Sequence, residues 1–215
     1  MTPAEARLLA ESATRFDVEL DGEAVGRLER FLELLELWNR RIHLTGTRHP
    51  QAVLQKHVID SLAPVPHLPA AGLVIDVGSG AGFPGVVLGC VRPDLELRLV
   101  ESRRRPASFL REAIRAVPLP QARVLEARAE AVDEPEVAGG AAVVIARALT
   151  LEVFLPLAAR LVAPRGLVIA MQTPGVPAAT AVSAAELAGL QQSGAVDYQL
   201  PGGEPRRLLF FSAMC

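Results

Sequence analysis

The stretch Asp76–Gly85, which reads Asp-Val-Gly-Ser-Gly-Ala-Gly-Phe-Pro-Gly, decides the fold of this 215-residue chain. It begins inside the short apolar run Leu73–Val77, which is typical of a buried strand. The glycines at positions 78, 80 and 82 allow a tight turn that can approach a ligand, because no Cβ stands in the way. Pro84 suits the first turn of a helix, where its missing N–H costs nothing. The stretch therefore predicts a strand, a ligand-binding turn and a helix.

The spacing of the glycines indicates which ligand the turn binds. A dinucleotide site favours G-x-G-x-x-G, whose third glycine would stand where this chain has Phe83. The observed G-x-G-x-G, preceded by Asp76, instead resembles motif I of S-adenosylmethionine enzymes, and Phe83 can line the cofactor pocket. We therefore expect S-adenosyl-L-methionine as the cofactor, with contacts at Gly78 and Gly80. The alternative is a strand-to-helix turn that binds nothing.

Two acidic residues follow the next strands at positions that support this cofactor. Glu101 ends the second predicted strand, 23 positions after Gly78, where an acidic side chain reaches the ribose hydroxyls of an adenosine ligand. Arg128-Ala129-Glu130 follows the third strand, where a loop could frame the adenine ring. Glu130 taken alone fits a helix cap or a solvated charge equally well.

Apolar runs from position 73 onward alternate with helical stretches, as strands buried on both faces of a parallel sheet require. These runs are Leu73–Val77, Leu95–Glu101, Ala122–Ala127, Ala141–Ala146 and Gly166–Met171, each followed by enough residues for a crossover helix. An Ala- and Leu-rich helix to about Gln192 leads to Ala195–Leu200 and Arg207–Ser212, which the turn-rich link Pro201–Glu204 joins as a hairpin. The sequence predicts the α/β, Rossmann-like S-adenosylmethionine-dependent methyltransferase fold, with a mostly parallel seven-stranded sheet.

Residues 1–70 are expected to form an N-terminal helical cap on a core of residues 71–215, the two making one compact unit. Apolar residues recur every three or four positions between Asp21 and Arg41, which predicts an amphipathic helix. Asp21 can cap this helix, and Glu36 and Arg40 are spaced to pair on its outer face. A second helical stretch from Pro50 to Leu62 ends before two prolines.

The composition indicates a cytoplasmic globular protein without a metal. Neither a run of about 20 apolar residues nor a signal-peptide pattern is present. Cys90 and Cys215 form no C-x-x-C pair, and the four histidines are not spaced as a metal cluster. We therefore expect no membrane contact, no disulfide and no metal, and we assign no catalytic acid or base.

The net charge of −2 is unusual for a protein that binds many phosphates, but the basic residues are unevenly placed. One cluster falls between positions 40 and 57 and another between 103 and 115, with few acids in either. The candidates for RNA contacts are Arg40, Arg41, Arg48, Lys56, Arg103, Arg104 and Arg105. The same residues would also suit an ordinary solvated surface.

Taken together, these segments resemble, nearly end to end, the ribosomal small-subunit methyltransferase G family, also called glucose-inhibited division protein B. The resemblance rests on Leu37-Trp38-Asn39, Leu44-Thr45, Lys56–Leu62, Asp76–Gly85, Glu101-Ser102, Phe109-Leu110, Arg128-Ala129-Glu130 and Ala146-Arg147-Ala148. It implies methylation of N7 of a guanine in 16S ribosomal RNA, with the RNA or the small ribosomal subunit as partner and a monomeric enzyme. The family's cofactor contacts would fall on Gly78, Phe83, Ala129, Glu130 and Arg147, and Glu101 is added by the strand-end argument.

Two segments depart from the family pattern. Met171–Gly175 lacks the usual Lys-Gly pair after the fifth strand, and Arg105-Pro106 replaces a basic pair. These departures leave other functions open: methylation of a small molecule or protein, a nucleotide- or NAD-binding domain, or a non-catalytic RNA-binding module. In the guanine reaction the N7 lone pair can attack the methyl group directly, so no general base is needed.

Overall fold

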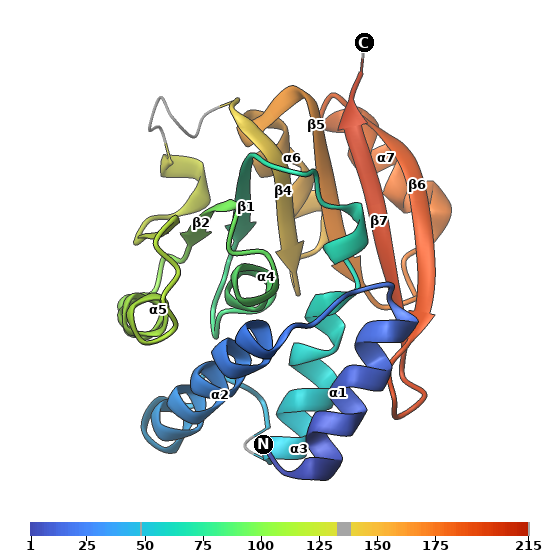
Figure 1. The fold of residues 1–215 in the computed structure, drawn as a ribbon. Helices are drawn as coiled ribbons and strands as arrows, with labels where there is room; N and C mark the ends of the chain where they lie inside the picture. Colours follow the sequence, from blue (N-terminus) through green and yellow to red (C-terminus); the bar gives the residue numbers. More distant parts are fainter. Residues whose placement is uncertain (48, 133–138, 215) are drawn as a thin grey trace.

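The computed structural model describes residues 1–47, 49–132 and 139–214, and these residues adopt the predicted α/β fold (Figure 1). The seven strands stand in the order β3-β2-β1-β4-β5-β7-β6. Their bounds are β1 Leu73–Val77, β2 Glu96–Val100, β3 Ala122–Leu125, β4 Ala141–Arg147, β5 Val162–Gln172, β6 Leu190–Gln199 and β7 Pro205–Ala213. Strands β1 to β5 are parallel, and β7 runs antiparallel between β5 and β6. The strand order reverses between β1 and β4, and the carboxyl ends of strands at such a point are where ligands bind.

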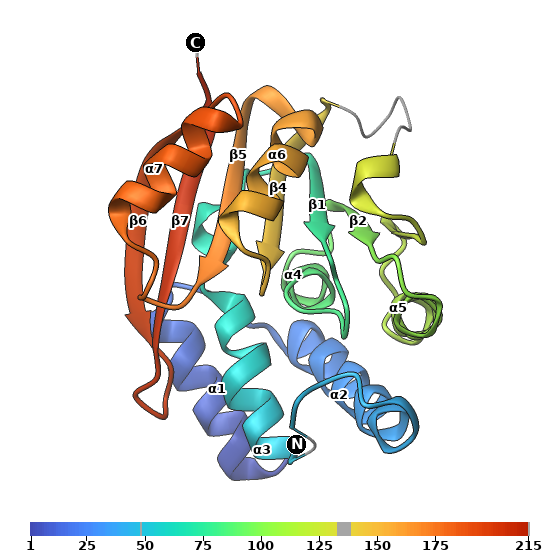
Figure 2. The same cartoon turned by 180° about the vertical axis from the view of Figure 1, so that it is seen from behind.

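Helices cover both faces of the sheet. On one face lie α4 (Gly85–Val91) and α5 (Arg104–Ala116), and on the other α6 (Leu151–Leu161) and α7 (Ala178–Leu187), which Figure 2 shows in front of the strands. Because neighbouring strand residues point to opposite faces, Val74 belongs to the first core and Ile75 to the second. The long apolar runs of the sequence are explained by this burial on both faces.

The N-terminal cap consists of α1 (Pro3–Arg15), α2 (Gly22–Ile42), α3 (Pro50–Val53), the π-helical turn η1 (Leu54–Val58) and the 3₁₀ turns η2 (Asp60–Leu62) and η3 (Val65–His67). The buried side chains of α2 join the same apolar cluster as those of α4 and α5. Asp21 caps α2 through the N–H of Ala24 at 2.6 Å, as predicted. In Figure 1 the helices of the cap lie at the end of the sheet to which the arrowhead of β4 points. The cap therefore covers part of the carboxyl edge.

Three elements differ from the sequence predictions. Helix α7 ends at Leu187 and not near Gln192, because Gly189 has a φ of +72° and Leu190 already starts β6. The predicted second helix is divided into α3, η1 and η2. Between β3 and β4, the described residues hold the 3₁₀ turn η4 (Ala129–Ala131) in place of a crossover helix. Among the described helices, none is long and apolar enough to cross a membrane.

Candidate functional site

The glycine turn after β1 is fastened to the end of β2 by backbone hydrogen bonds. The N–H groups of Gly78 and Ser79 both donate to the carbonyl of Val100, at 2.9 and 3.0 Å. Gly78 and Gly80 have φ of +75° and +53°, which favours glycine. A Cβ on Gly78 would meet only the side chain of Leu149 within 4 Å. The backbone at Gly78 is therefore open to a ligand, as the sequence predicts.

The third glycine of the motif has another purpose. A Cβ on Gly82 would lie 2.8 Å from Cγ2 of Val86 and 3.1 Å from the ring of Phe31 in α2. The sequence predicts that Gly82 helps the backbone to approach a ligand. Gly82 is instead buried and makes no such approach. It allows the turn to pack under the cap.

Glu101 connects the turn to the start of α5. Its Oε2 accepts the N–H of Gly80 at 2.9 Å, and its Oε1 accepts the backbone N–H of Arg103 at 2.8 Å and the Nε of Arg103 at 3.1 Å. The residue is only 4% exposed. The structure thus brings two predicted cofactor contacts, Gly80 and Glu101, into direct contact, and it pairs one RNA candidate, Arg103, with the same carboxylate.

Asp76, the acidic residue of the motif, lies inside the protein. Its Oδ2 accepts the N–H of Gly85 at 3.0 Å, while its Oδ1 has no hydrogen-bond partner among the described residues. Burial raises the pKa of Asp76 to about 6. Asp76 therefore stabilises the turn from the interior, through its bond to Gly85, and is not placed to touch a ligand.

Phe83 is enclosed between the cap and the end of β4. His57 of η1 stacks on its ring with centroids 5.1 Å apart, and the guanidinium carbon of Arg147 lies 5.2 Å from the ring centroid. The ring of Phe31 meets it edge-on at 5.4 Å. Phe83 is only 4% exposed, so little of this residue is accessible to a cofactor.

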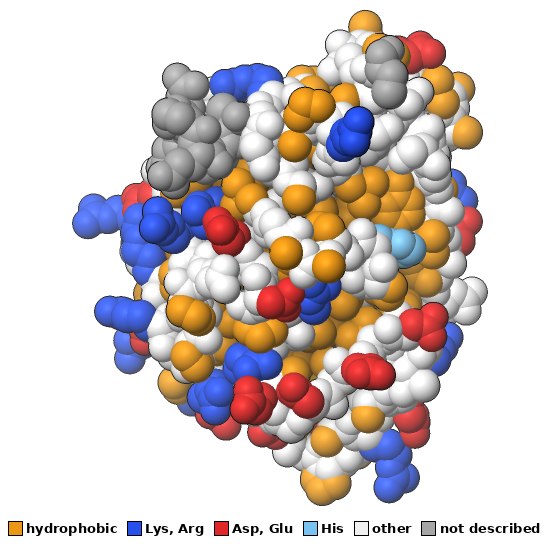
Figure 3. Space-filling view, turned by 45° about the horizontal axis from the view of Figure 1, so that its top comes forward, with side chains coloured by type: hydrophobic (Ala, Val, Ile, Leu, Met, Phe, Trp, Pro, Cys, Tyr) orange, Lys and Arg blue, Asp and Glu red, His pale blue; other side chains and the backbone are white. Residues whose placement is uncertain are grey.

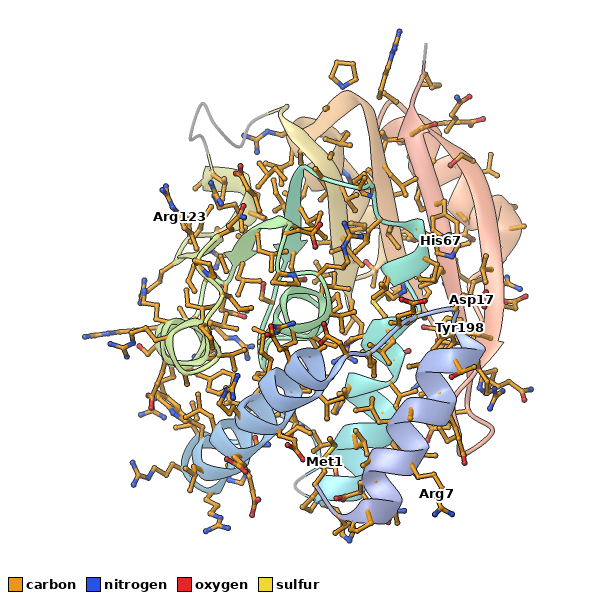
Figure 4. All side chains as sticks on the ribbon, viewed as in Figure 1. Met1, Arg7, Asp17, His67, Arg123 and Tyr198 are labelled. Atoms are coloured by element: carbon orange, nitrogen blue, oxygen red, sulfur yellow. The ribbon has the colours of Figure 1, made fainter. Side chains whose placement is uncertain are left out.

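The carboxylate of Asp60 joins the cap to three strands. Its Oδ2 lies 3.2 Å from Nη1 of Arg147 at the end of β4, and its Oδ1 accepts the hydroxyl of Tyr198 at 2.7 Å. Arg206 at the start of β7 approaches the same carboxylate at 3.7 Å. Figure 4 shows Tyr198 on β6 beside the end of α1, where Phe16 packs against its ring. Burial and the neighbouring carboxylate raise the pKa of Tyr198.

A cavity of about 370 Å³ opens next to this network. We call it the charged cavity, because Lys56, Asp60, Arg147, Glu204 and Arg206 line it. The end of β5 also borders it through Gln172 and Thr173, and the amide of Gln172 donates to the carbonyl of Leu149 at 2.8 Å. The segment that departs from the family pattern thus holds the loop after β4.

A second cavity, of about 320 Å³, lies where His43 of the first basic cluster meets the arginines that begin the second cluster. We call it the basic groove: it lies between the end of α2 and the start of α5 and is lined by Ile42, His43, Leu44, Arg103, Arg104, Arg105 and Pro106. In Figure 3, Lys and Arg side chains are most frequent on the left, the side of α5 in Figure 1. Basic charge is therefore concentrated locally, despite the net charge of −2.

The other predicted contacts are more dispersed. Arg40 pairs with Glu36 at 2.6 Å, as its spacing predicts, and Arg41 is exposed near the end of the same helix. Lys56 lies in the charged cavity, and Arg48 is outside the described residues. Ala129 and Glu130 form η4 after β3, where the Glu130 carbonyl accepts Nη1 of Arg160 at 2.9 Å.

The partners of Asp60 and Lys56 that come from the end of the chain were missed by sequence reasoning. Tyr198, Glu204 and Arg206 lie far along the chain from Asp60, and no local motif connects them. One signal was present: an acidic residue at position 60, directly after the apolar pair Val58-Ile59, requires a partner if it is buried. Burial, followed by the nearby charge of Arg147, lowers the pKa of His57 to about 4, so this histidine is neutral at neutral pH.

Comparison with known proteins identifies relatives across most of the chain. A family model described as "GidB: rRNA small subunit methyltransferase G" matches residues 25–200. A protein of Xanthomonas campestris pv. campestris, named ribosomal RNA small subunit methyltransferase G, is 40% identical over 191 residues, covering 88% of this chain and 87% of its own length. A protein of the same name from Halorhodospira halophila is 42% identical over 156 residues, or 72% of each chain.

Solved structures support the fold at lower sequence identity. M. jannaschii TYW2, determined in complex with AdoMet, superposes with a TM-score of 0.59 at 15% identity, covering 74% of this chain and 77% of that one. A precorrin-6y C5,15-methyltransferase from Geobacter metallireducens gives a TM-score of 0.55 at 13% identity, covering 72% and 86%. At these identities the two structures show a shared methyltransferase fold and no more.

Proposed function

The chain belongs to the rRNA small subunit methyltransferase G family, and on that premise we propose that it transfers a methyl group from S-adenosyl-L-methionine to N7 of a guanine in 16S ribosomal RNA. The observation that carries the proposal is the exposed backbone at Gly78 beside the Glu101 carboxylate, at the carboxyl ends of β1 and β2. This arrangement stands beside the point where the strand order reverses, at the same edge of the sheet as the charged cavity.

The residues at the turn suit this cofactor. The open face of Gly78 admits a ligand to the backbone, and Oε2 of Glu101, which accepts only the N–H of Gly80, keeps a lone pair that can accept a ribose hydroxyl. Ala129 and Glu130 would border the adenine ring, Phe83 would line the pocket, and Arg147 would face the amino-acid end. When bound, the cofactor supplies an electrophilic methyl group.

The chain's own part in the reaction is to position the base. Guanine N7 carries an in-plane lone pair, so no side chain has to remove a proton before the transfer. His57 is neutral and stacked on Phe83, and Asp60 is bound by Arg147 and Tyr198. These groups fix the wall of the charged cavity, and alignment of the base would supply most of the rate enhancement.

RNA would bind along the basic side of the molecule. Arg41, Arg104 and Arg105 are exposed at or beside the basic groove, and Lys56 lies at the charged cavity. Contacts to phosphates from these positions make binding dependent on salt. Arg40 and Arg48 remain predicted contacts. Because ribosomal RNA is the substrate, we also place the protein in the cytoplasm and expect it to act as a monomer.

The function is tested with small ribosomal subunits from a strain that lacks this enzyme. The purified protein and S-adenosyl-L-methionine carrying a labelled methyl group are incubated with these subunits and, separately, with naked 16S ribosomal RNA. We expect label on one guanine, at a position that becomes cleavable in the manner of 7-methylguanosine. Absence of transfer to both substrates, with the cofactor bound, would refute the RNA assignment. Stabilisation against heat by NAD and not by the cofactor would refute the site.

A further inference from the structure

The two carboxylates of the charged cavity are held differently. Asp60 is 3% exposed and is bound by Arg147 and Tyr198. The side chain of Glu204 is 37% exposed and lies just after the turn that joins β6 to β7. Glu204 can therefore leave the cavity without uncovering a buried charge, whereas Asp60 cannot.

Glu204 bridges two cations that come from separate parts of the fold. Its Oε1 accepts the ammonium of Lys56 in η1, and its Oε2 accepts Nη2 of Arg206 at 3.0 Å. The ammonium of Lys56 lowers the pKa of the Glu204 carboxyl, so the side chain is charged at neutral pH. A phosphodiester also offers two anionic oxygens to such donors, and arginine and lysine bind it in the same manner.

The turn that carries Glu204 has room to move. A Cβ on Gly202 or Gly203 would meet no atom within 4 Å, and Gly203 has a φ of +80°. Two backbone hydrogen bonds close the turn: the N–H of Leu200 donates to the carbonyl of Glu204 at 3.0 Å, and the N–H of Gly203 donates to the carbonyl of Leu200 at 2.8 Å. The two glycines are thus unpacked, and the side chain of Glu204 is itself 37% exposed, so it can change rotamer at the surface.

We propose that Lys56 and Arg206 form a binding site for a phosphodiester of the RNA substrate, and that Glu204 fills this site in the free protein until the phosphate displaces it. The inference rests on the proposed function, which supplies the RNA. It assigns a contact to Arg206 and makes Glu204 a competitor of the substrate. Removal of a carboxylate from the active-site region is therefore expected to strengthen RNA binding.

Glu204→Gln is the decisive variant. It keeps the size of the side chain and one of its two acceptor oxygens, and it removes the charge that competes with phosphate. We expect the affinity for purified small ribosomal subunits at fixed salt to rise about two- to five-fold, the range of an exposed ion pair. The affinity for S-adenosyl-L-methionine should stay unchanged.

The matched control is Asp197→Asn on the same hairpin. Asp197 forms a bidentate ion pair with Arg207, at 2.6 and 2.7 Å, and neither residue belongs to the described lining of the charged cavity. This variant removes the same single charge from the same hairpin. It should change the affinity for small subunits by less than about 1.5-fold, because only long-range repulsion is relieved.

The cationic side of the site is tested by the salt dependence of binding. Lys56→Gln and Arg206→Gln should each weaken the affinity and reduce the slope of log affinity against log salt by about 0.7 to 1, while Arg207→Gln should not. Thermal unfolding of every variant, compared with that of the wild type, identifies any that is simply unfolded.

The remaining outcomes decide against the inference. Weaker binding by Glu204→Gln would mean that the carboxylate contacts the RNA base, and unchanged binding would mean that no phosphate reaches Lys56 and Arg206. Tighter binding of S-adenosyl-L-methionine alone would assign the site to the carboxylate of the cofactor. In each case a wild-type protein that still methylates small subunits leaves the proposed function intact, and a wild-type protein that does not methylate them refutes the function itself.

Discussion

The glycine turn and the charged cavity lie at the same edge of the sheet, but they are held together in different ways. The turn is fixed by backbone hydrogen bonds between neighbouring strand ends, with the carbonyl of Val100 accepting two of them. The cavity is fixed by side chains: Asp60 in the cap binds Arg147 of β4 and Tyr198 of β6. A site built on backbone tolerates many side-chain changes, whereas one built on a shared carboxylate depends on that single residue.

The largest expected effect concerns this carboxylate. Asp60→Ala leaves the guanidinium of Arg147 and the hydroxyl of Tyr198 without their buried partner, so we expect the free energy of unfolding to fall by about 3–5 kcal/mol. Denaturant unfolding measures this loss. Tyr198→Phe, which removes only one donor, should cost about 1–2 kcal/mol. A loss below about 1 kcal/mol for Asp60→Ala would show that the cavity does not depend on the shared carboxylate.

The glycine turn should separate stability from binding. Gly82→Ala places a methyl group 2.8 Å from Val86 at a φ of +87°, so we expect a loss of about 3 kcal/mol in stability. Gly78→Ala should cost only about 1 kcal/mol in stability. It should weaken the binding of S-adenosyl-L-methionine at least about tenfold, because the new Cβ would occupy the space through which the ligand reaches the backbone. Calorimetric titration with the cofactor measures the second effect. If Gly78→Ala binds normally, the turn does not hold the cofactor.

The two regions should also respond to pH in opposite directions. The pKa of His57 is lowered to about 4 in the folded protein, so its contribution to stability is complete above the unfolded value of about 6.5 and is lost as pH falls toward 4. The pKa of Asp76 is raised to about 6, so its contribution is complete below about 3.8 and is lost as pH rises through 6. Each amounts to about 3 kcal/mol.

Denaturant unfolding between pH 4 and 8 tests both contributions. His57→Gln should remove the loss of stability on acidification, and Asp76→Asn, which keeps an acceptor for the N–H of Gly85, should remove the loss on raising the pH. A variant whose pH profile matches that of the wild type would mean that the group is not perturbed in the folded protein.

The smallest effect is expected at the basic groove. Arg104→Gln and Arg105→Gln should each weaken binding to small subunits about two- to three-fold and reduce the salt slope by about 0.7, because each removes one phosphate contact. Cofactor affinity should not change. Arg165→Gln, an exposed arginine at the opposite end of β5 from the charged cavity, is the control. Equal effects of all three variants would point to general charge attraction and not to a groove.

The glycine turn could be predicted from the sequence because its determinants are consecutive. Strand β1, the turn and the start of α4 occupy one continuous segment, and Glu101 follows at the end of the next strand. Backbone geometry alone then determines that Gly80 and Glu101 meet. The predicted role of Gly82 as a ligand contact was wrong. Its neighbour Phe31 belongs to the cap, and the sequence does not indicate which helix crosses the turn.

The charged cavity could not be predicted in the same way. Lys56, Arg147 and Glu204 become neighbours only through the antiparallel insertion of β7 beside β5 and the placement of the cap over the strand ends. Nothing local in a strand such as β6 indicates that Tyr198 reaches Asp60. The packing of α2 on α5, which the sequence does not indicate, places His43 of the first basic cluster in one groove with Arg103, Arg104 and Arg105 of the second.

Helix α2 has a consequence for how the two ligands would influence each other. It is one continuous helix of 21 residues, which packs Phe31 against Phe83 of the glycine turn and ends at the basic groove. If RNA tilts the last turn of this helix, Phe31 would shift against Phe83 and so against the turn that would hold the cofactor. Thermodynamic reciprocity then requires that the cofactor alter RNA affinity by the same factor by which RNA alters cofactor affinity, so the order of addition leaves the ternary complex equally stable.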